Sequence, residues 1–162
     1  MEPTPRTQSA SAPTVSPALG EAQHHRCEFG ISIEALEDWL STPVEPGFAR
    51  ELAKRVAELE EYLVEHIALV ENPKGGLFAE IVAMAPRLTH AVQQLREDHP
   101  RLAERARTAR ALAGALADPP AEEAASAAVE AAQSLIEALR AHRQRGAHVV
   151  YEAYAFDLGD AD

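Results

Sequence analysis

The amino-acid sequence predicts an all-α protein, an antiparallel four-helix bundle built from three long helices and a short first helix. Composition is the first reason: of 162 residues, 46% are hydrophobic and only 5% aromatic, and Ala, Leu, Glu and Arg are abundant. These four residue types lose little rotamer freedom in a helix. Spacing is the second reason, because apolar residues recur three and four positions apart over long segments, as in helices with one buried face. An antiparallel bundle is the natural way to bury such faces.

The first 26 residues are rich in Pro, Ser, Thr and Ala and carry no hydrophobic period. Such a segment buries too little apolar surface to offset the entropy lost on ordering, so we predict that residues 1–26 are a disordered tail. The bundle is expected over residues 27–158, followed by a short tail at 159–162. Its first helix is predicted at 32–40, where Ser32 can cap the helix and the apolar side chains share one face.

Longer helices follow, and proline and glycine mark their ends. The second helix is predicted at 48–72, where an Asn-Pro-Lys-Gly-Gly sequence stops it. A short apolar helical segment at 77–85 precedes a third helix over 86–116, in which Pro100 predicts a kink. After an Asp-Pro-Pro loop, the last helix begins near Glu122.

Charge and cysteine content exclude several classes of protein. The chain has 15 Lys and Arg against 26 Asp and Glu, which gives a formal net charge of −11. Nucleic acids and anionic membranes bind to basic faces, so neither partner is expected. Cys27 is the only cysteine, which rules out an intrachain disulfide and favours a reducing compartment. No apolar run approaches the ~20 residues that span a bilayer and the N-terminus lacks a secretory signal, so we expect a cytoplasmic protein.

Three predicted helices each carry one histidine on an otherwise apolar stripe: His66, His99 and His142. At ~1.5 Å per residue, His99 and His142 lie about 25 and 30 Å from one end of the bundle. From the other end, His66 and His99 each lie about 20 Å deep, if residues 77–85 extend the helical path. The three imidazoles are therefore expected to meet at one level. Burying them is costly unless each finds a partner, and one Fe or Zn ion satisfies all three together.

A simpler interpretation of these histidines remains open. Each can be a buried or half-buried residue that bonds to a neighbouring group, with no metal involved. The other four histidines differ, because His90 and His148 fall off the apolar stripes and His24 and His25 lie within the predicted tail.

Gly146 lies in the last helix, four residues after His142. A glycine inside a helix costs about 1 kcal/mol relative to alanine. Close approach of a neighbouring helix is the favoured explanation, and space for a small ligand above His142 is the alternative. The adjacent Arg143 and Arg145 are expected to be solvated or to pair with acidic residues of the same helix.

The sequence around the three histidines resembles the hemerythrin-like (HHE cation-binding) family. LVEHIALVENPKGGLF is similar to the family's His-x-x-x-Glu-Glu…Leu-Phe stretch, REDHPRL to its Glu-His-x-x-Leu, and LIEALRAHRQRGAHVVYEAY to its closing Leu-x-x-His-x-x-x-Glu-Glu segment. The resemblance covers roughly residues 48–158. It implies a four-helix bundle that holds a non-haem di-iron site for oxygen binding, for redox or iron sensing, or for iron handling.

Departures from the family's pattern imply a smaller ligand set. A di-iron site needs about five histidines and two bridging carboxylates. After His66, Glu71 alone can serve as the expected carboxylate, whereas Gly146 and Ala147 occupy the equivalent positions of the last helix and cannot ligate a metal. Asp98 faces differently from its neighbour on the helix. The resemblance therefore implies a reduced metal site made of His66, Glu71, His99 and His142.

Two functions follow from this ligand set. The first is a binding protein, not an enzyme, that holds non-haem iron or zinc for sensing or sequestration. The second is a metal-free bundle that acts as a scaffold for a protein partner or forms a homodimer. A short first helix would leave one groove thinly covered, and exposed apolar grooves commonly bind a partner.

Overall fold

The computed structural model describes residues 16–155, and over this range the protein is all-α, as predicted. Five α-helices pack against one another, and the described residues contain no strand. Each helix in this range is too short or too polar to span a membrane. The elements are α1 (Pro17–Leu40), α2 (Phe48–Val70), α3 (Leu77–Met84), the short 3-10 helix η1 (Pro86–Leu88), α4 (Thr89–Gly114) and α5 (Glu122–Ala155).

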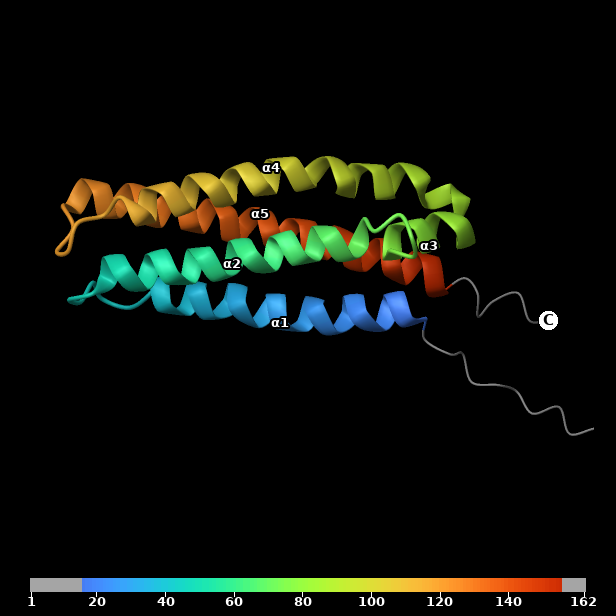
Figure 1. Ribbon diagram of the computed structural model, residues 1–162, viewed down its shortest axis with the longest axis horizontal. Coiled ribbons are helices and arrows are strands. Elements are labelled where there is room, and N and C mark those ends of the chain that lie inside the picture. Colours follow the sequence, from blue (N-terminus) through green and yellow to red (C-terminus); the bar gives the residue numbers. More distant parts are fainter. Residues whose placement is uncertain (1–15, 156–162) are drawn as a thin grey trace, which may run out of the picture.

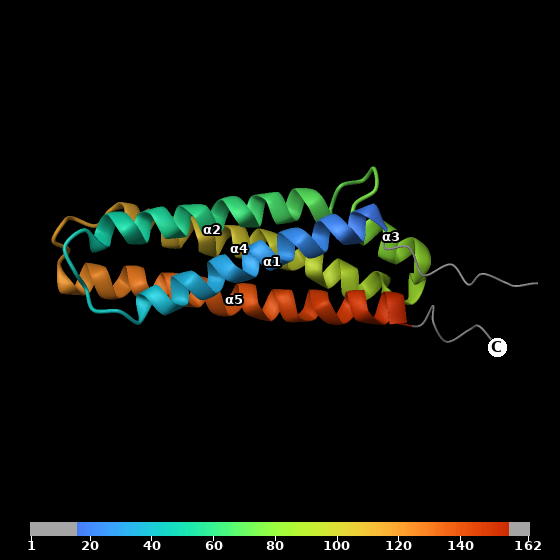
Figure 2. The ribbon, with the colours of Figure 1, turned by 90° about the horizontal axis from the view of Figure 1, so that it is seen from below.

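The four long helices lie lengthwise beside one another, and α3 closes one end (Figure 1). Helix α1 contacts α2 and α5, and α4 contacts the same two helices. Each long helix runs opposite to the helices that it contacts, as the two views in Figures 1 and 2 show. The two ends of the described chain lie together near α3.

The position at which α1 begins contradicts part of the prediction that residues 1–26 are a disordered tail. The helix starts at Pro17, so residues 17–26 are helical, while residues 1–15 lie outside the described range. Ser16 caps this start, because its Oγ accepts a hydrogen bond from the backbone N–H of Leu19 at 3.1 Å. A capping serine followed by proline at the first helical position is a helix start signal, and our prediction overlooked it.

Sparse apolar residues are enough to hold this added part of α1. Leu19 and Ala22 are buried in the region next to α3 and the end of α5. Ser32, the predicted cap, instead lies inside the helix and donates a hydrogen bond to the carbonyl oxygen of Glu28. The first helix is therefore a long one, and it covers the groove that a short helix would have left open.

The other predicted elements are confirmed with small shifts at their ends. Helix α2 ends at Val70, two residues earlier than predicted, and Gly75 after it takes a positive φ of 113°. Pro100 lies inside α4, and α5 begins at Glu122. The predicted tail at 159–162 lies outside the described residues.

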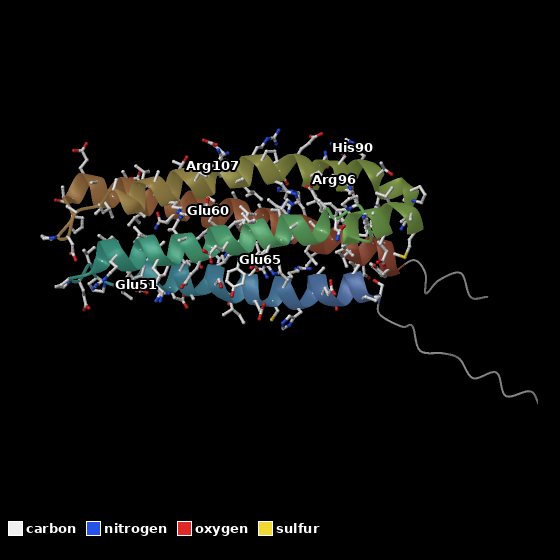
Figure 3. All side chains as sticks on the ribbon, in the orientation of Figure 1. Glu51, Glu60, Glu65, His90, Arg96 and Arg107 are labelled. Carbon is white, nitrogen blue, oxygen red and sulfur yellow. The ribbon has the colours of Figure 1, made fainter. Side chains whose placement is uncertain are left out.

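Charged side chains cover the outside of the helices, as Arg107 does on α4 (Figure 3). Ion pairs join neighbouring helices across the surface. Arg110 Nη1 lies 2.6 Å from Glu60 Oε2 and joins α4 to α2, while Arg140 pairs with Glu37 and joins α5 to α1.

The buried apolar side chains form two separate cores. The large core contains Leu63, Leu102 and Leu139 and fills the bundle on the side away from α3. The small core contains Val70, Leu95, Val149 and the buried side chains of α3. The level between the two cores is where the polar side chains of the interior lie.

Candidate metal centre

Each of the three predicted histidines lies at the level that separates the two cores. In α2, His66 follows Leu63 of the large core and precedes Val70 of the small core. The corresponding pairs are Leu95 and Leu102 around His99 in α4, and Leu139 and Val149 around His142 in α5. The three helices therefore present their histidines to one another in the middle of the bundle.

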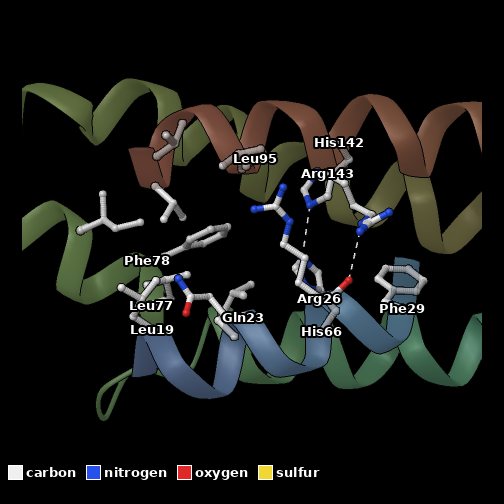
Figure 4. A pocket seen from close by; sticks show the side chains of 16 residues that line it. Leu19, Gln23, Arg26, Phe29, His66, Leu77, Phe78, Leu95, His142 and Arg143 are labelled. Atoms are coloured by element: carbon white, nitrogen blue, oxygen red, sulfur yellow. Dashed lines mark hydrogen bonds between the residues drawn. The ribbon is translucent and has the colours of Figure 1, made fainter. Parts of the chain in front are cut away.

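The three imidazoles meet, and this prediction is confirmed. His142 Nε2 lies 3.3 Å from His99 Nε2 and 3.4 Å from His66 Nε2. One ligand atom from each residue lies within 4.8 Å of those of the other two. His99 and His142 are 3% and 2% exposed, and His66 is half-buried. Figure 4 shows His66 and His142 facing each other from α2 and α5.

Carboxylates bond to the outward nitrogen of two of these rings. His99 Nδ1 donates to Glu71 Oε1 at 2.5 Å, and His142 Nδ1 donates to Asp98 Oδ2 at 3.4 Å. Arg145 donates to the same Asp98 oxygen at 2.6 Å. Burial alone would raise the pKa of Asp98, but the hydrogen bonds from Arg145 and His142 outweigh it and hold that pKa below its usual value. Asp98 is therefore ionised and must accept.

These contacts fix which nitrogen carries the proton. In a neutral imidazole one nitrogen donates and the other accepts. Because Nδ1 donates in His99 and His142, both Nε2 atoms present lone pairs, and these face each other at 3.3 Å. If His66 Nε2 carries a proton, it can donate a hydrogen bond to one of these two nitrogens but not to both. Carboxylates behind metal-ligating histidines fix the ring in the same way.

Protonation of His66 or His142 does not resolve this repulsion near neutral pH. Burial, reinforced by the neighbouring His142 and His99, lowers the pKa of His66 to about 3. Burial and His99 lower the pKa of His142 to about 4, although Asp98 acts in the opposite direction. His66 and His142 are therefore neutral near pH 7, and nitrogen lone pairs that converge in this way suit a cation.

Aromatic rings pack against the cluster from both sides. Phe78 of α3 stacks on His99 with ring centroids 5.8 Å apart and an interplanar angle of 7°. His25 of α1 stacks on His66 at 6.0 Å, and its Nε2 donates to the carbonyl oxygen of Tyr62 at 3.1 Å. His25 was expected in a disordered tail, so sequence reasoning missed its place beside the cluster. These contacts hold the rings in position.

Glu71, the predicted carboxylate ligand, lies on the outer side of His99 and bonds to that ring instead of pointing into the cluster. Helix α2 ends at Val70, so Glu71 is free to turn toward α4 and reach the outward nitrogen of His99. The group of side chains able to share one ion within the described residues consists of His66, His99 and His142. No bridging carboxylate belongs to that group, so these residues do not fit a pair of metal ions.

A cavity of about 80 Å³ opens beside His66 and His142, toward the small core. Gly146 lines it, and a Cβ atom at this position would meet nothing within 4 Å. The favoured explanation of Gly146, close approach of another helix, is therefore wrong. Close approach occurs instead at Gly30, where a Cβ would lie 2.4 Å from Arg143 Nη2.

Of the two arginines next to Gly146, Arg143 differs from expectation and Arg145 agrees with it in part. Arg143 is half-buried, and its Nη2 donates to the carbonyl oxygen of Arg26 at 3.1 Å. Arg145 is exposed, as expected, but its ion pair is with Asp98 of α4 and not with an acidic residue of its own helix. Asp98 is not among the predicted ligands, because it faces differently from His99 on the helix. This direction brings its carboxylate to His142.

Comparison with protein-family models, with curated proteins and with solved structures found no match to this chain. The inference about function therefore rests on the geometry of the site and on the sequence pattern around its histidines.

Proposed function

We propose that this protein binds one divalent metal ion through His66, His99 and His142, within a four-helix bundle of the hemerythrin-like kind. The observation that carries the proposal is the convergence of Nε2 lone pairs whose outward nitrogens donate to Glu71 and Asp98. Our proposed role is sensing or sequestration of the ion, not catalysis.

Two of the three nitrogen separations match those around a tetrahedral zinc ion, and all three ligand atoms lie within 4.8 Å of one another. Zinc binds imidazole at about 2.0–2.1 Å, usually in tetrahedral geometry, so two ligand nitrogens on one ion lie about 3.3–3.4 Å apart. The two Nε2 separations around His142 are 3.3 and 3.4 Å. Non-haem iron is the second candidate, because imidazole also suits iron. With three protein ligands, a fourth position is left for water or another small molecule.

Metal titration tests the proposal. Protein purified without an affinity tag and stripped with a chelator should bind one equivalent of Zn²⁺ and melt at a higher temperature when loaded. His99→Ala and His142→Ala should each abolish that rise in melting temperature. Iron should be tested under anaerobic conditions in the same way.

Two exposed histidines provide matched controls. His90 lies on the outer face of α4, the helix that carries His99 (Figure 3). His148 is exposed on α5, the helix that carries His142. His90→Ala and His148→Ala should keep the full response to Zn²⁺. Loss of the response in these controls, or its survival in His99→Ala and His142→Ala, would contradict the proposed ligands.

The expected feature that supported the alternative, a metal-free scaffold, is absent from the described residues. That alternative rested on a short first helix and a thinly covered groove, whereas α1 spans Pro17–Leu40 and contacts both α2 and α5. A metal-free scaffold would bind less than a tenth of an equivalent of Zn²⁺ or Fe²⁺ and would melt at the same temperature with or without them.

A further inference from the structure

The cavity beside the histidine cluster combines an apolar wall with two guanidinium groups. Its apolar side is formed by residues from all five α-helices, among them Leu19, Val70, Phe78, Leu95 and Val149. On the side of His66 and His142, it is lined by Arg26 and Arg143 (Figure 4). This division into an apolar part and a cationic part is the pattern of a site for a small amphipathic anion.

Arg26 points its charge into this space. Figure 4 shows its side chain reaching from α1 across the cavity, with the guanidinium between Phe78 and His142. Arg26 is half-buried, and within residues 16–155 no carboxylate forms an ion pair with it. A partly desolvated guanidinium with free donors is a strong binding group for a carboxylate, which it can hold through two parallel hydrogen bonds.

Arg143 adds a second positive charge next to Arg26. Its Nη2 is held by the Arg26 carbonyl oxygen, and its Nε is buried without a hydrogen-bond partner among the described residues. Burial and the charge of Arg26 lower the pKa of the Arg143 guanidinium. Two neighbouring cations that repel each other are stabilised by an anion bound beside them.

Gly146 keeps the cavity open. It lies in the interior of α5, where glycine weakens a helix, and no neighbouring atom lies within 4 Å of the position that a Cβ atom would take. Packing therefore does not require glycine here. A larger residue at 146 would extend from the wall that Gly146 forms and would occupy part of the cavity.

We propose that this cavity binds a short-chain carboxylate of about four to six carbon atoms. One water-sized sphere needs about 10–15 Å³ of such space, so the cavity accommodates about five to eight non-hydrogen atoms. The carboxylate pairs with Arg26, and the alkyl chain packs against Phe78 and Leu95. This site is separate from the proposed metal centre. Its binding groups are Arg26 and the apolar wall, and binding needs no metal.

Calorimetric titration of the full chain with isovalerate, after removal of metal with a chelator, tests this proposal. We expect saturable binding of one equivalent. Isovaleramide lacks the charge and acetate lacks the alkyl chain, so each should bind at least tenfold more weakly. Arg26→Gln should weaken isovalerate binding roughly tenfold or more, since a hydrogen bond to a charged group is lost. The control Arg107→Gln removes an exposed arginine of α4 and should bind as the wild type does.

A second variant fills the cavity instead of removing the charge. Gly146→Leu should abolish isovalerate binding without lowering the melting temperature, whereas Gly114→Leu at the exposed end of α4 should leave binding unchanged. The proposal is overturned if the wild type shows no saturable binding, if isovaleramide or acetate binds as well as isovalerate, or if Arg26→Gln or Gly146→Leu binds like the wild type.

Discussion

Replacing Glu71 tests whether this residue supports a metal ligand from behind. Its carboxylate accepts a 2.5 Å hydrogen bond from Nδ1 of His99, whose side chain is only 3% exposed. Glu71→Gln keeps an oxygen that can accept this bond but removes the charge. Glu71→Ala removes the bond and frees the His99 ring to change its protonated nitrogen. The two variants therefore separate the effect of charge from the effect of orientation.

The expected losses follow from what outer partners contribute to metal sites. Mutation of a group that bonds to a ligating histidine typically weakens metal binding 10- to 100-fold, or by about 1.4–2.8 kcal/mol. We expect about tenfold for Glu71→Gln and about 100-fold for Glu71→Ala. The full loss is expected for alanine because the bond is charge-assisted and partly buried.

A competition titration of Zn²⁺ against a chromophoric chelator measures these changes. Glu61→Gln is the matched control, because Glu61 is an exposed glutamate on α2. Its affinity should equal that of the wild type. Zinc affinities of both Glu71 variants within threefold of this control would show that the carboxylate has no supporting role and that the protonation pattern inferred for His99 is incorrect.

The metal-free protein should lose stability as the pH falls from 7 to 5. Unfolded histidine titrates near pH 6.5, whereas burial and the neighbouring histidines hold the pKa of His66 at about 3 and that of His142 at about 4. Only the unfolded chain gains these protons over this range, so each histidine lowers the unfolding free energy by about 2 kcal/mol. Urea unfolding at pH 7 and pH 5 measures this change. Equal unfolding free energies at the two pH values would contradict it. Gly146→Ala should raise the unfolding free energy by about 1 kcal/mol, because alanine favours the helix and meets no obstacle. Gly30→Ala should gain less than this, because its Cβ would displace the Arg143 guanidinium from the Arg26 carbonyl oxygen, and equal effects at the two glycines would contradict the assigned packing.

The long helices could be predicted because their apolar stripes are regular. In α2, α4 and α5 the buried residues recur every three or four positions, and loops rich in Pro and Gly separate these helices. The first half of α1 could not be predicted from its stripe, because only Leu19 and Ala22 are buried there before Phe29. Packing against α3 and the end of α5 stabilises this segment, and such tertiary contacts override a weak local pattern.

The level of the three histidines could be predicted, but their partners could not. Helix rise alone places His66, His99 and His142 at a common depth, since it depends only on residue counts. The bonds from Glu71 and Asp98 depend on how a helix ends and how side chains turn between helices. The apolar pattern of a sequence carries no information about either.

X-ray absorption at the zinc edge of the protein loaded with one equivalent of Zn²⁺ would examine the coordination shell itself. Convergent imidazoles predict about three histidine nitrogens at about 2.0–2.1 Å, together with one light-atom ligand. The wild type should give this spectrum, and His142→Ala should not. A shell made only of oxygen atoms, or fewer than two imidazoles per zinc, would contradict a metal centre built from His66, His99 and His142.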